Sequence, residues 1–122
     1  MKTDIINFVP KGWGYEKWIH NSDLYCGKIL FFVKGKKCSW HYHEKKDEVF
    51  YVLSGKVVVL YSGENHGIDF INLANKIVLV KGEKWHVPTG MRHRIIALED
   101  SEILEISTHH EDSDSFRIEV GD

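Results

Sequence analysis

Residues 35–55 read GKKCSWHYHEKKDEVFYVLSG, and this stretch decides the fold and the chemistry expected of the chain. His41 and His43 are two residues apart in a predicted strand, so both side chains project from the same face. Glu48 shares one side of the following apolar run with Phe50. If these two strands lie side by side, two imidazoles and one carboxylate converge, which is a donor set that divalent transition metals prefer. Taken alone, an H-x-H pair can equally be the polar, solvent-facing edge of a strand.

The composition around this stretch favours β-structure. The chain has 122 residues, enough for one core, and 43% of them are hydrophobic. Ile and Val are frequent, whereas Ala occurs only at positions 74 and 97, so the balance is against helices. Short apolar runs separated by turn residues predict strands at 25–33, 39–43, 48–53, 56–62, 77–80, 85–87, 93–98 and 103–108. Such spacing is typical of a β-sandwich or barrel. Residues 109–115 (HHEDSDS) are expected to be the least structured, a mobile and solvated stretch without a metal site.

Charge and hydropathy exclude several classes of protein. The formal net charge of −2 argues against a dedicated nucleic-acid-binding protein. No apolar run approaches the ~18 residues that a membrane-spanning helix needs. The N-terminal residues lack the apolar stretch of a signal peptide, and two cysteines are too few for a disulfide scaffold. We therefore expect a cytoplasmic protein that has no nucleic-acid or membrane partner.

A second stretch, residues 82–97 (GEKWHVPTGMRHRIIA), completes a two-part pattern. The first part of the chain fits G-x5-H-x-H-x4-E-x6-G over residues 35–55, and the second fits G-x5-P-x-G-x2-H-x3-N over residues 82–97. The last position alone differs, because Ala97 replaces the asparagine. This pattern resembles the signature of the cupin superfamily. Its glycines, among them Gly35, Gly55 and Gly82, fall where the chain must turn sharply, often with positive φ.

The resemblance implies one cupin domain over residues 1–122, folded as an all-β jelly-roll barrel (a double-stranded β-helix). It also implies one divalent transition metal inside the barrel, held by residues corresponding to His41, His43, Glu48 and His93. Fe, Mn, Co, Ni and Zn all suit these ligands, and the sequence does not choose among them. In a six-coordinate site two positions stay open, as catalysis requires. Whether the chain is an enzyme is left open.

Both ends of the chain narrow the resemblance. Residues 12–16 (GWGYE) and the closing segment LEISTHHEDSDSFRIEVGD are similar to mannose-6-phosphate isomerase-like cupins, in particular the C-terminal domain of the type II enzymes. This similarity implies a sugar-phosphate or related small polar substrate and an aldose–ketose isomerisation through a metal-assisted enediol. Two alternatives remain: an Fe(II)-dependent dioxygenase, and a non-catalytic, metal-dependent module that binds a sugar or another small molecule.

Five further side chains are candidates for roles around the metal. His86 or Glu105 could act as the base that moves a proton between adjacent carbons, although His86 could equally be a buried core histidine. Arg92, Arg94 or Arg117 could hold the phosphate in a two-point contact. Because strand residues alternate, Arg92 and Arg94 could instead face away from the metal as ordinary surface charges.

Two aromatic side chains predict an interface. Trp40 and Tyr42 alternate with the ligand histidines and must face the opposite way. On the outside of a barrel these rings need cover from a terminal strand or from a second subunit. On this basis we expect a homodimer.

Overall fold

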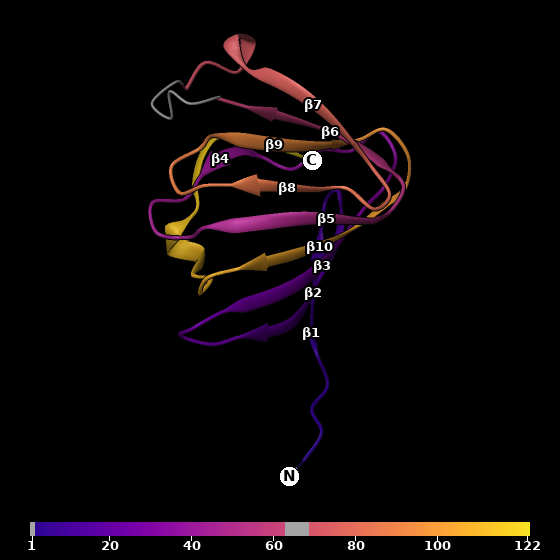
Figure 1. Ribbon diagram of the computed structural model, residues 1–122, viewed down its shortest axis with the longest axis vertical. Coiled ribbons are helices and arrows are strands. Elements are labelled where there is room, and N and C mark those ends of the chain that lie inside the picture. Colours follow the sequence, from indigo (N-terminus) through magenta and orange to yellow (C-terminus); the bar gives the residue numbers. More distant parts are fainter. Residues whose placement is uncertain (1, 63–68) are drawn as a thin grey trace.

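The computed structural model describes residues 2–62 and 69–122, which form two antiparallel β-sheets that face each other (Figure 1). The strands of the six-stranded sheet, in order across it, are β1 (Asn7–Lys11), β2 (Gly14–Asn21), β3 (Cys26–Phe32), β10 (Ser101–Ser107), β5 (Glu48–Ser54) and β8 (Lys84–Val87). Those of the five-stranded sheet are β11 (Phe116–Glu119), β4 (Trp40–Tyr42), β9 (His93–Ala97), β6 (Lys56–Tyr61) and β7 (Asn75–Val80). The expected all-β jelly-roll barrel is confirmed.

The order of the strands brings distant parts of the sequence together. From β3 to β11 the chain crosses repeatedly from one sheet to the other, so β4 and β9 become neighbours although about fifty residues separate them. Two short 3-10 helices, Ile71–Leu73 and Asp112–Asp114, lie in the connections. No helix of the described segments is long and apolar enough to cross a membrane.

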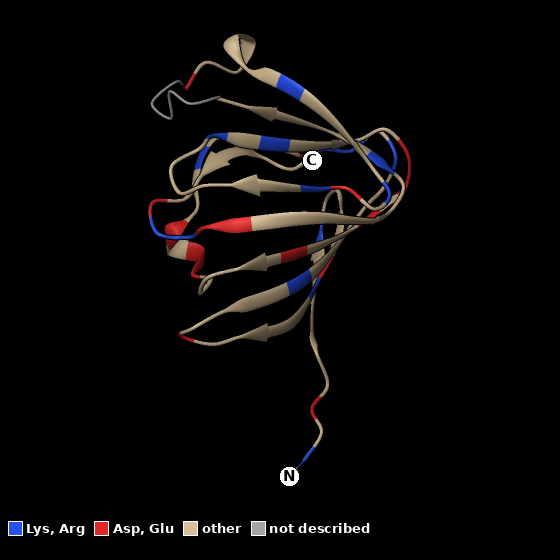
Figure 2. Cartoon of the chain, in the orientation of Figure 1, with Lys and Arg blue, Asp and Glu red and all other residues tan. Residues whose placement is uncertain are grey.

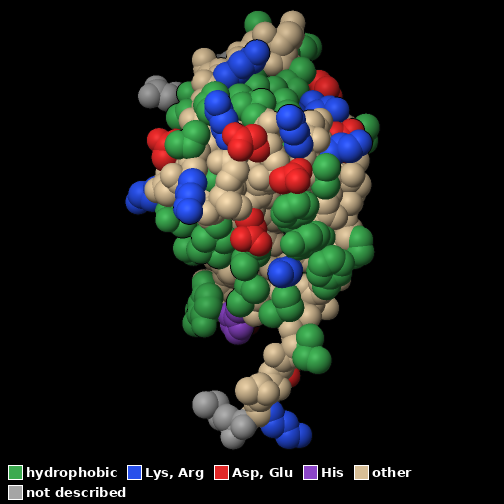
Figure 3. All heavy atoms as spheres, turned by 90° about the vertical axis from the view of Figure 1, so that its right-hand side faces the viewer, with side chains coloured by type: hydrophobic (Ala, Val, Ile, Leu, Met, Phe, Trp, Pro, Cys, Tyr) green, Lys and Arg blue, Asp and Glu red, His purple; other side chains and the backbone are tan. Residues whose placement is uncertain are grey.

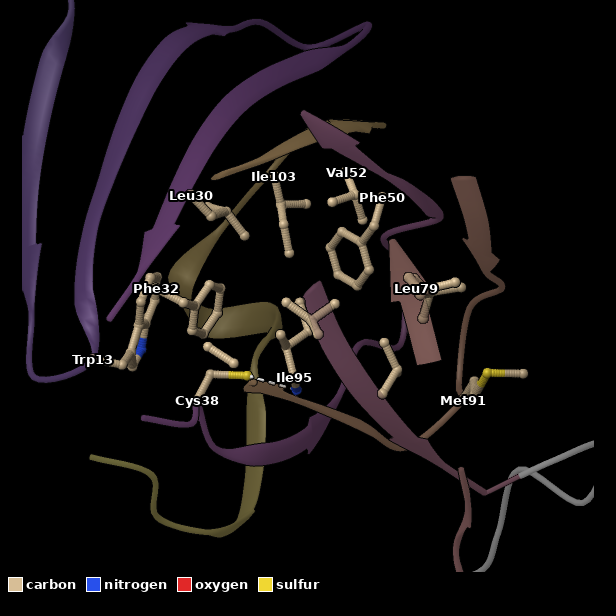
Figure 4. Close-up of a cluster of buried hydrophobic side chains, with 14 residues drawn as sticks. Trp13, Leu30, Phe32, Cys38, Phe50, Val52, Leu79, Met91, Ile95 and Ile103 are labelled. Carbon is tan, nitrogen blue, oxygen red and sulfur yellow. Dashed lines mark hydrogen bonds between the residues drawn. The ribbon is translucent and has the colours of Figure 1, made fainter. Parts of the chain in front are cut away.

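The inward-facing side chains divide the interior of the barrel into an apolar end and a polar end. On β3, β5 and β10 every second residue is buried, as expected for strands with one face in a core. At one end these inward positions carry apolar side chains of both sheets, which point toward one another (Figure 4): Trp13, Leu30, Phe32, Phe50, Val52, Val57, Val59, Ile95 and Ile103. At the other end the buried inward positions carry polar groups: Lys28, Glu48, His93, Glu105 and Ser107. The apolar end supplies the core, and the polar end holds the candidate site.

The turns carry glycines in the left-handed region, as the sequence indicated. Gly55, between β5 and β6, has φ +88°, and Gly82, between β7 and β8, has φ +90°. A Cβ at Gly55 would also collide with the backbone of Asp100 and Ser101. Another residue at position 55 would therefore be strained in both respects.

Candidate metal centre

Three histidine side chains meet between the sheets at the polar end of the barrel. His41 on β4 is the register partner of His93 on β9, because these two strands pair antiparallel at that point. His43 follows two residues after His41, just beyond the end of β4. Ring nitrogens of the three side chains lie within 4.8 Å of one another. The structure thus brings together three of the four expected metal ligands.

Each of the three rings is oriented by a hydrogen bond from its Nδ1 atom. His41 Nδ1 contacts the carbonyl oxygen of Ser39, His43 Nδ1 that of Asp114, and His93 Nδ1 that of Met91, each at 2.9 Å. A carbonyl oxygen can only accept, so each Nδ1 carries the proton and each neutral ring has its lone pair on Nε2. This arrangement is the usual one for histidines that bind a metal through Nε2.

Burial keeps the imidazoles of His41 and His43 neutral. Loss of solvent, with the neighbouring His93 and His43 rings adding to it, lowers the pKa of His41 well below its usual value. Burial likewise lowers the pKa of His43, to about 4, although the Glu48 carboxylate opposes the shift. At neutral pH both rings therefore present unprotonated nitrogens, the form in which histidine binds a metal.

Glu48, the first residue of β5, completes the group. Its Oε1 lies 3.0 Å from Nε2 of His93, and its Oε2 lies 3.6 Å from Nε2 of His43. Burial alone would raise the pKa of Glu48, but the Lys46 ammonium holds this pKa well below the usual value, so the side chain is a carboxylate. In the described segments, His93 Nε2 has no hydrogen-bond partner. A lone pair on nitrogen thus faces a carboxylate oxygen, which is unfavourable unless a cation lies between them.

Three neutral imidazole nitrogens and one carboxylate fit a divalent transition metal. Because all three Nδ1 atoms are engaged with carbonyl groups, the Nε2 atoms are the nitrogens left to coordinate it. His41, His43, His93 and Glu48 would hold such an ion.

A buried lysine that the sequence analysis missed lies behind Glu48. Lys46 Nζ donates to Oε2 of Glu105 at 3.0 Å and to Nδ1 of His110 at 3.2 Å, and it lies 3.0 Å from Oε2 of Glu48. Burial alone would lower the pKa of Lys46, but Glu105 and Glu48 raise it above its usual value. His110 Nε2 in turn contacts the Asp112 carboxylate at 2.9 Å. Lys46 lies in the loop before β5, among charged residues that ordinarily face solvent, so no signal in the sequence indicated its burial.

The prediction that residues 109–115 are solvated is wrong for His110 and Asp114, which are buried, whereas Glu111, Asp112 and Ser113 are exposed. Asp114 is buried, and its carboxylate accepts hydrogen bonds from the backbone N–H groups of Glu44, Lys45 and Lys46 at 3.0 to 3.1 Å. Its carbonyl oxygen accepts from His43, as described above. Small and acidic residues of this kind are typical of a solvated tail. Here, however, Asp114 accepts the hydrogen bonds of backbone N–H groups in the loop between β4 and β5.

The histidines face a cavity of about 750 Å³ that runs from the metal centre to the outside. This volume lies in the range of pockets that enclose a small molecule. Polar residues predominate in its lining, with both charge signs present: Lys11, Glu16, Lys28, His41, His43, Lys46, Glu48, His93, Glu105, His110, Asp112, Arg117 and Asp122. Figure 2 shows acidic positions on both β5 and β10, and the register of these strands places Glu105 opposite Phe50 and Glu48 opposite Ser107.

The candidates for proton transfer fall in different places. Glu105 lines the cavity, and burial, followed by the nearby Glu48 charge, raises its pKa even though Lys46 opposes the shift. His86 lies on the outer side of β8, where its side chain is 57% exposed and its Nε2 contacts Asp47 at 2.9 Å. It is therefore neither a cavity residue nor the buried core histidine that the alternative described.

The three candidate arginines differ in their position relative to the cavity. Arg117 on β11 lines the cavity. Arg92 is engaged elsewhere, with its Nε atom 2.8 Å from Asp69 and its guanidinium 3.6 Å from the centre of the Tyr42 ring. Arg94 is buried and donates to the carbonyl oxygens of Cys38 and Val120. Arg94 thus fastens the C-terminal segment to the barrel, and it is neither a surface charge nor part of the cavity lining.

Trp40 and Tyr42 are covered by the chain itself. Trp40 is fully buried, and its Nε1 donates to the carbonyl oxygen of Asp69 at 2.8 Å. Tyr42 stacks on Phe116 of the terminal strand β11, with the ring centres 5.2 Å apart. The terminal strand covers Tyr42, as expected for one of the two rings, and Trp40 is buried within the chain. These rings give no reason for a second subunit.

Comparison with known proteins agrees with this geometry. The cupin domain family matches residues 29–109. The chain belongs to the cupin family. The matched segment includes all four candidate ligands of this cupin. No curated protein matches the chain.

Solved structures share the fold of this cupin at low sequence identity. KdgF from Halomonas sp. superposes with a TM-score of 0.72 at 21% identity, over 88% of this chain and 91% of that one. Oxalate decarboxylase from Bacillus subtilis gives 0.78 at 20% identity, over 92% of this chain and 30% of its own. The capsular polysaccharide assembling protein CapF from Staphylococcus aureus gives 0.75 at 21%, over 97% of this chain and 35% of its own. This cupin spans about a third of the length of the latter two proteins.

Proposed function

We propose that this cupin is a metal-dependent sugar-phosphate isomerase that uses one divalent Fe, Mn, Co, Ni or Zn ion. The observation that carries the proposal is the set of three Nε2 lone pairs and one carboxylate that face a polar cavity of about 750 Å³. When bound there, the metal supplies an electrophile that polarises a carbonyl or hydroxyl group of the substrate.

Within this proposal Glu105 moves the proton between the two adjacent carbons of the substrate. Its Oε2 is engaged by Lys46, and no described residue donates a hydrogen bond to its Oε1. Its raised pKa brings the carboxyl group closer to the range in which it can both accept and return a proton. Arg117, on the cavity lining, is placed to contact the phosphate. The similarity of the chain ends to mannose-6-phosphate isomerase-like cupins supports this class of substrate.

Deuterium exchange tests the proposal. The protein is loaded in turn with each of the five metals and incubated without oxygen with mannose 6-phosphate or fructose 6-phosphate in D2O. We expect deuterium at C2 of mannose 6-phosphate and at C1 of fructose 6-phosphate, detected by proton NMR, with at least one metal. Glu105→Gln should retain the metal and lose the exchange, because an amide cannot accept the proton.

Each other outcome contradicts the isomerase. In a parallel incubation of the Fe(II)-loaded protein with oxygen, oxygen consumption together with no exchange would indicate a dioxygenase. Sugar binding without either reaction would indicate a binding module. Absence of exchange with all five metals would overturn the proposal.

We also propose a homodimer, formed through a surface other than the one around Trp40. The outer face of the six-stranded sheet carries exposed apolar side chains, with Ile19 48%, Tyr51 38% and Ile106 54% exposed. Ile5, in the segment before β1, is 97% exposed. Figure 1 shows this segment projecting from the barrel. Figure 3, which views the barrel from the ends of its strands, shows hydrophobic side chains in the half of the molecule next to this segment. With strands about 4.8 Å apart, this face is about 25 Å wide, wide enough for a self-association patch.

Replacing Ile106 with glutamate should convert the dimer into a monomer, because a charge would then be buried at its centre. Light scattering coupled to size-exclusion chromatography measures the mass. Val78→Glu is the matched control, since Val78 is 48% exposed on the other sheet, and this variant should stay dimeric. A monomeric parent protein, or a dimeric Ile106→Glu, would contradict the proposed interface.

A further inference from the structure

Lys28, in the middle of β3, is a second buried lysine in the cavity. Its side chain is 2% exposed and lines the same space as the histidine cluster. Its register partners are Trp18 on β2 and Glu105 on β10. Directly opposite residues in antiparallel strands point to the same side, so the three side chains form a row across the inner face of the sheet.

The ammonium group of Lys28 has donors that the chain does not use. Its Nζ lies 3.6 Å from Oε1 of Glu16 and 4.3 Å from the centre of the Trp18 ring. The same Glu16 oxygen already accepts a hydrogen bond from Trp18 Nε1 at 2.8 Å. The hydrogen bonds of residues 2–62 and 69–122 include none from Lys28 Nζ.

Lys46, in the same cavity, is a buried lysine whose ammonium group has close polar partners. Its Nζ has two carboxylate oxygens and a ring nitrogen within 3.2 Å. Lys28 has only the Glu16 carboxylate at ion-pair distance, so an oxygen that enters from the cavity would supply the hydrogen-bond partner that its ammonium group lacks. A charged oxygen compensates the buried cation better than a hydroxyl group does.

We propose that Lys28 is an anion anchor, which binds a terminal carboxylate or phosphate of a ligand whose other end reaches the histidine cluster. The proposal rests on the proposed function only in placing the ligand in the same cavity. The row continues from Lys28 through Glu105 to Phe50 on β5, whose ring centre lies 6.0 Å from that of His93. Two strand spacings, about 10 Å, separate the backbones of Lys28 and Phe50. A sugar acid or sugar phosphate is long enough to extend between the anchor and the metal centre.

Three matched probes test the anchor. Sorbitol, gluconate and sorbitol 6-phosphate share a six-carbon polyol chain and differ in the group at one end. Because they lack the aldose or ketose carbonyl, they cannot isomerise, and their binding is independent of catalysis. Isothermal titration of the zinc-loaded protein gives the Kd of each probe.

We expect at least one anionic probe to bind more tightly than sorbitol. Lys28→Met, which preserves length and removes charge, should weaken that anion at least about tenfold and leave sorbitol unchanged. Lys76→Met is the control, because Lys76 is exposed on β7 of the other sheet, and it should bind like the parent. Whether gluconate or sorbitol 6-phosphate binds distinguishes a carboxylate from a phosphate ligand.

NMR of the unmodified protein gives a second measurement that does not depend on the variant folding. The ε-methylene signal of Lys28 should shift when the anionic probe is added and stay in place with sorbitol. Unchanged anion affinity in Lys28→Met, an unmoved Lys28 signal, or no anion binding by the parent would each overturn the anchor. Failed deuterium exchange together with Lys28-dependent anion binding would overturn the isomerase alone.

Discussion

Replacing His93 with alanine should lower the affinity of the protein for Co²⁺ by at least about 100-fold. Loss of a group that only orients a metal ligand typically lowers metal affinity by about 10- to 100-fold, and this change removes a ligand itself. His93 lies at the centre of the site: it pairs with His41 across β4 and β9, and its Nε2 is 3.0 Å from Glu48. Its deletion leaves two imidazoles and the carboxylate without the geometry that four donors provide. Titration followed by the visible absorption of Co²⁺ measures the loss.

His20→Ala is the matched control for this experiment. His20 is an exposed histidine that stacks on Tyr25 outside the barrel, so its removal should leave the Co²⁺ affinity unchanged. Circular dichroism of both variants verifies that the β-structure is retained. A His93→Ala protein that is folded and binds Co²⁺ with the parent's Kd would show that the metal, if bound, lies elsewhere.

Replacing Asp114 with alanine should lower the free energy of unfolding by about 3 kcal/mol, because the backbone N–H groups of the β4–β5 loop lose a charged acceptor. The same change should weaken metal binding about tenfold, since the Asp114 carbonyl orients the His43 ring. Urea unfolding of the metal-free protein measures the first effect, and Co²⁺ titration measures the second.

Two comparisons separate this role from a general loss of charge. Asp114→Asn retains one carbonyl acceptor and should lie between the parent and Asp114→Ala in stability. Asp23→Ala removes an exposed carboxylate and should resemble the parent. If Asp114→Ala were as stable as Asp23→Ala, the loop would not depend on this cap.

The central strands could be predicted because they bury one face, which leaves a clear alternation or a continuous apolar run in the sequence. The three strands that were missed lack this signal. β1 contains Pro10 and forms the edge of its sheet, β2 is nowhere fully buried, and β11 is mostly exposed. Their pairing is set by tertiary contacts that leave little trace in local sequence.

The candidate ligands could be predicted from the sequence for a similar reason. His41, His43 and Glu48 follow strand parity, and His93 follows from the two-part pattern. The groups that support these ligands could not be predicted, because Lys46 and Asp114 lie in charged segments that ordinarily face solvent. Their burial depends on residues 44–46 and 114 meeting in space, about seventy positions apart in the chain. Only the folded topology brings these loops together.

The separation of the interior into an apolar and a polar end has a consequence for how such a scaffold changes over time. Side chains such as Phe32 and Val52 maintain folding from one half, while Lys28 and Glu105 contribute little hydrophobic stabilisation from the other. Substitutions in the polar half can therefore alter chemistry at small cost to the architecture. A barrel built in this way can acquire new reactions while its shell persists, and its substrate preference can diverge faster than its shape.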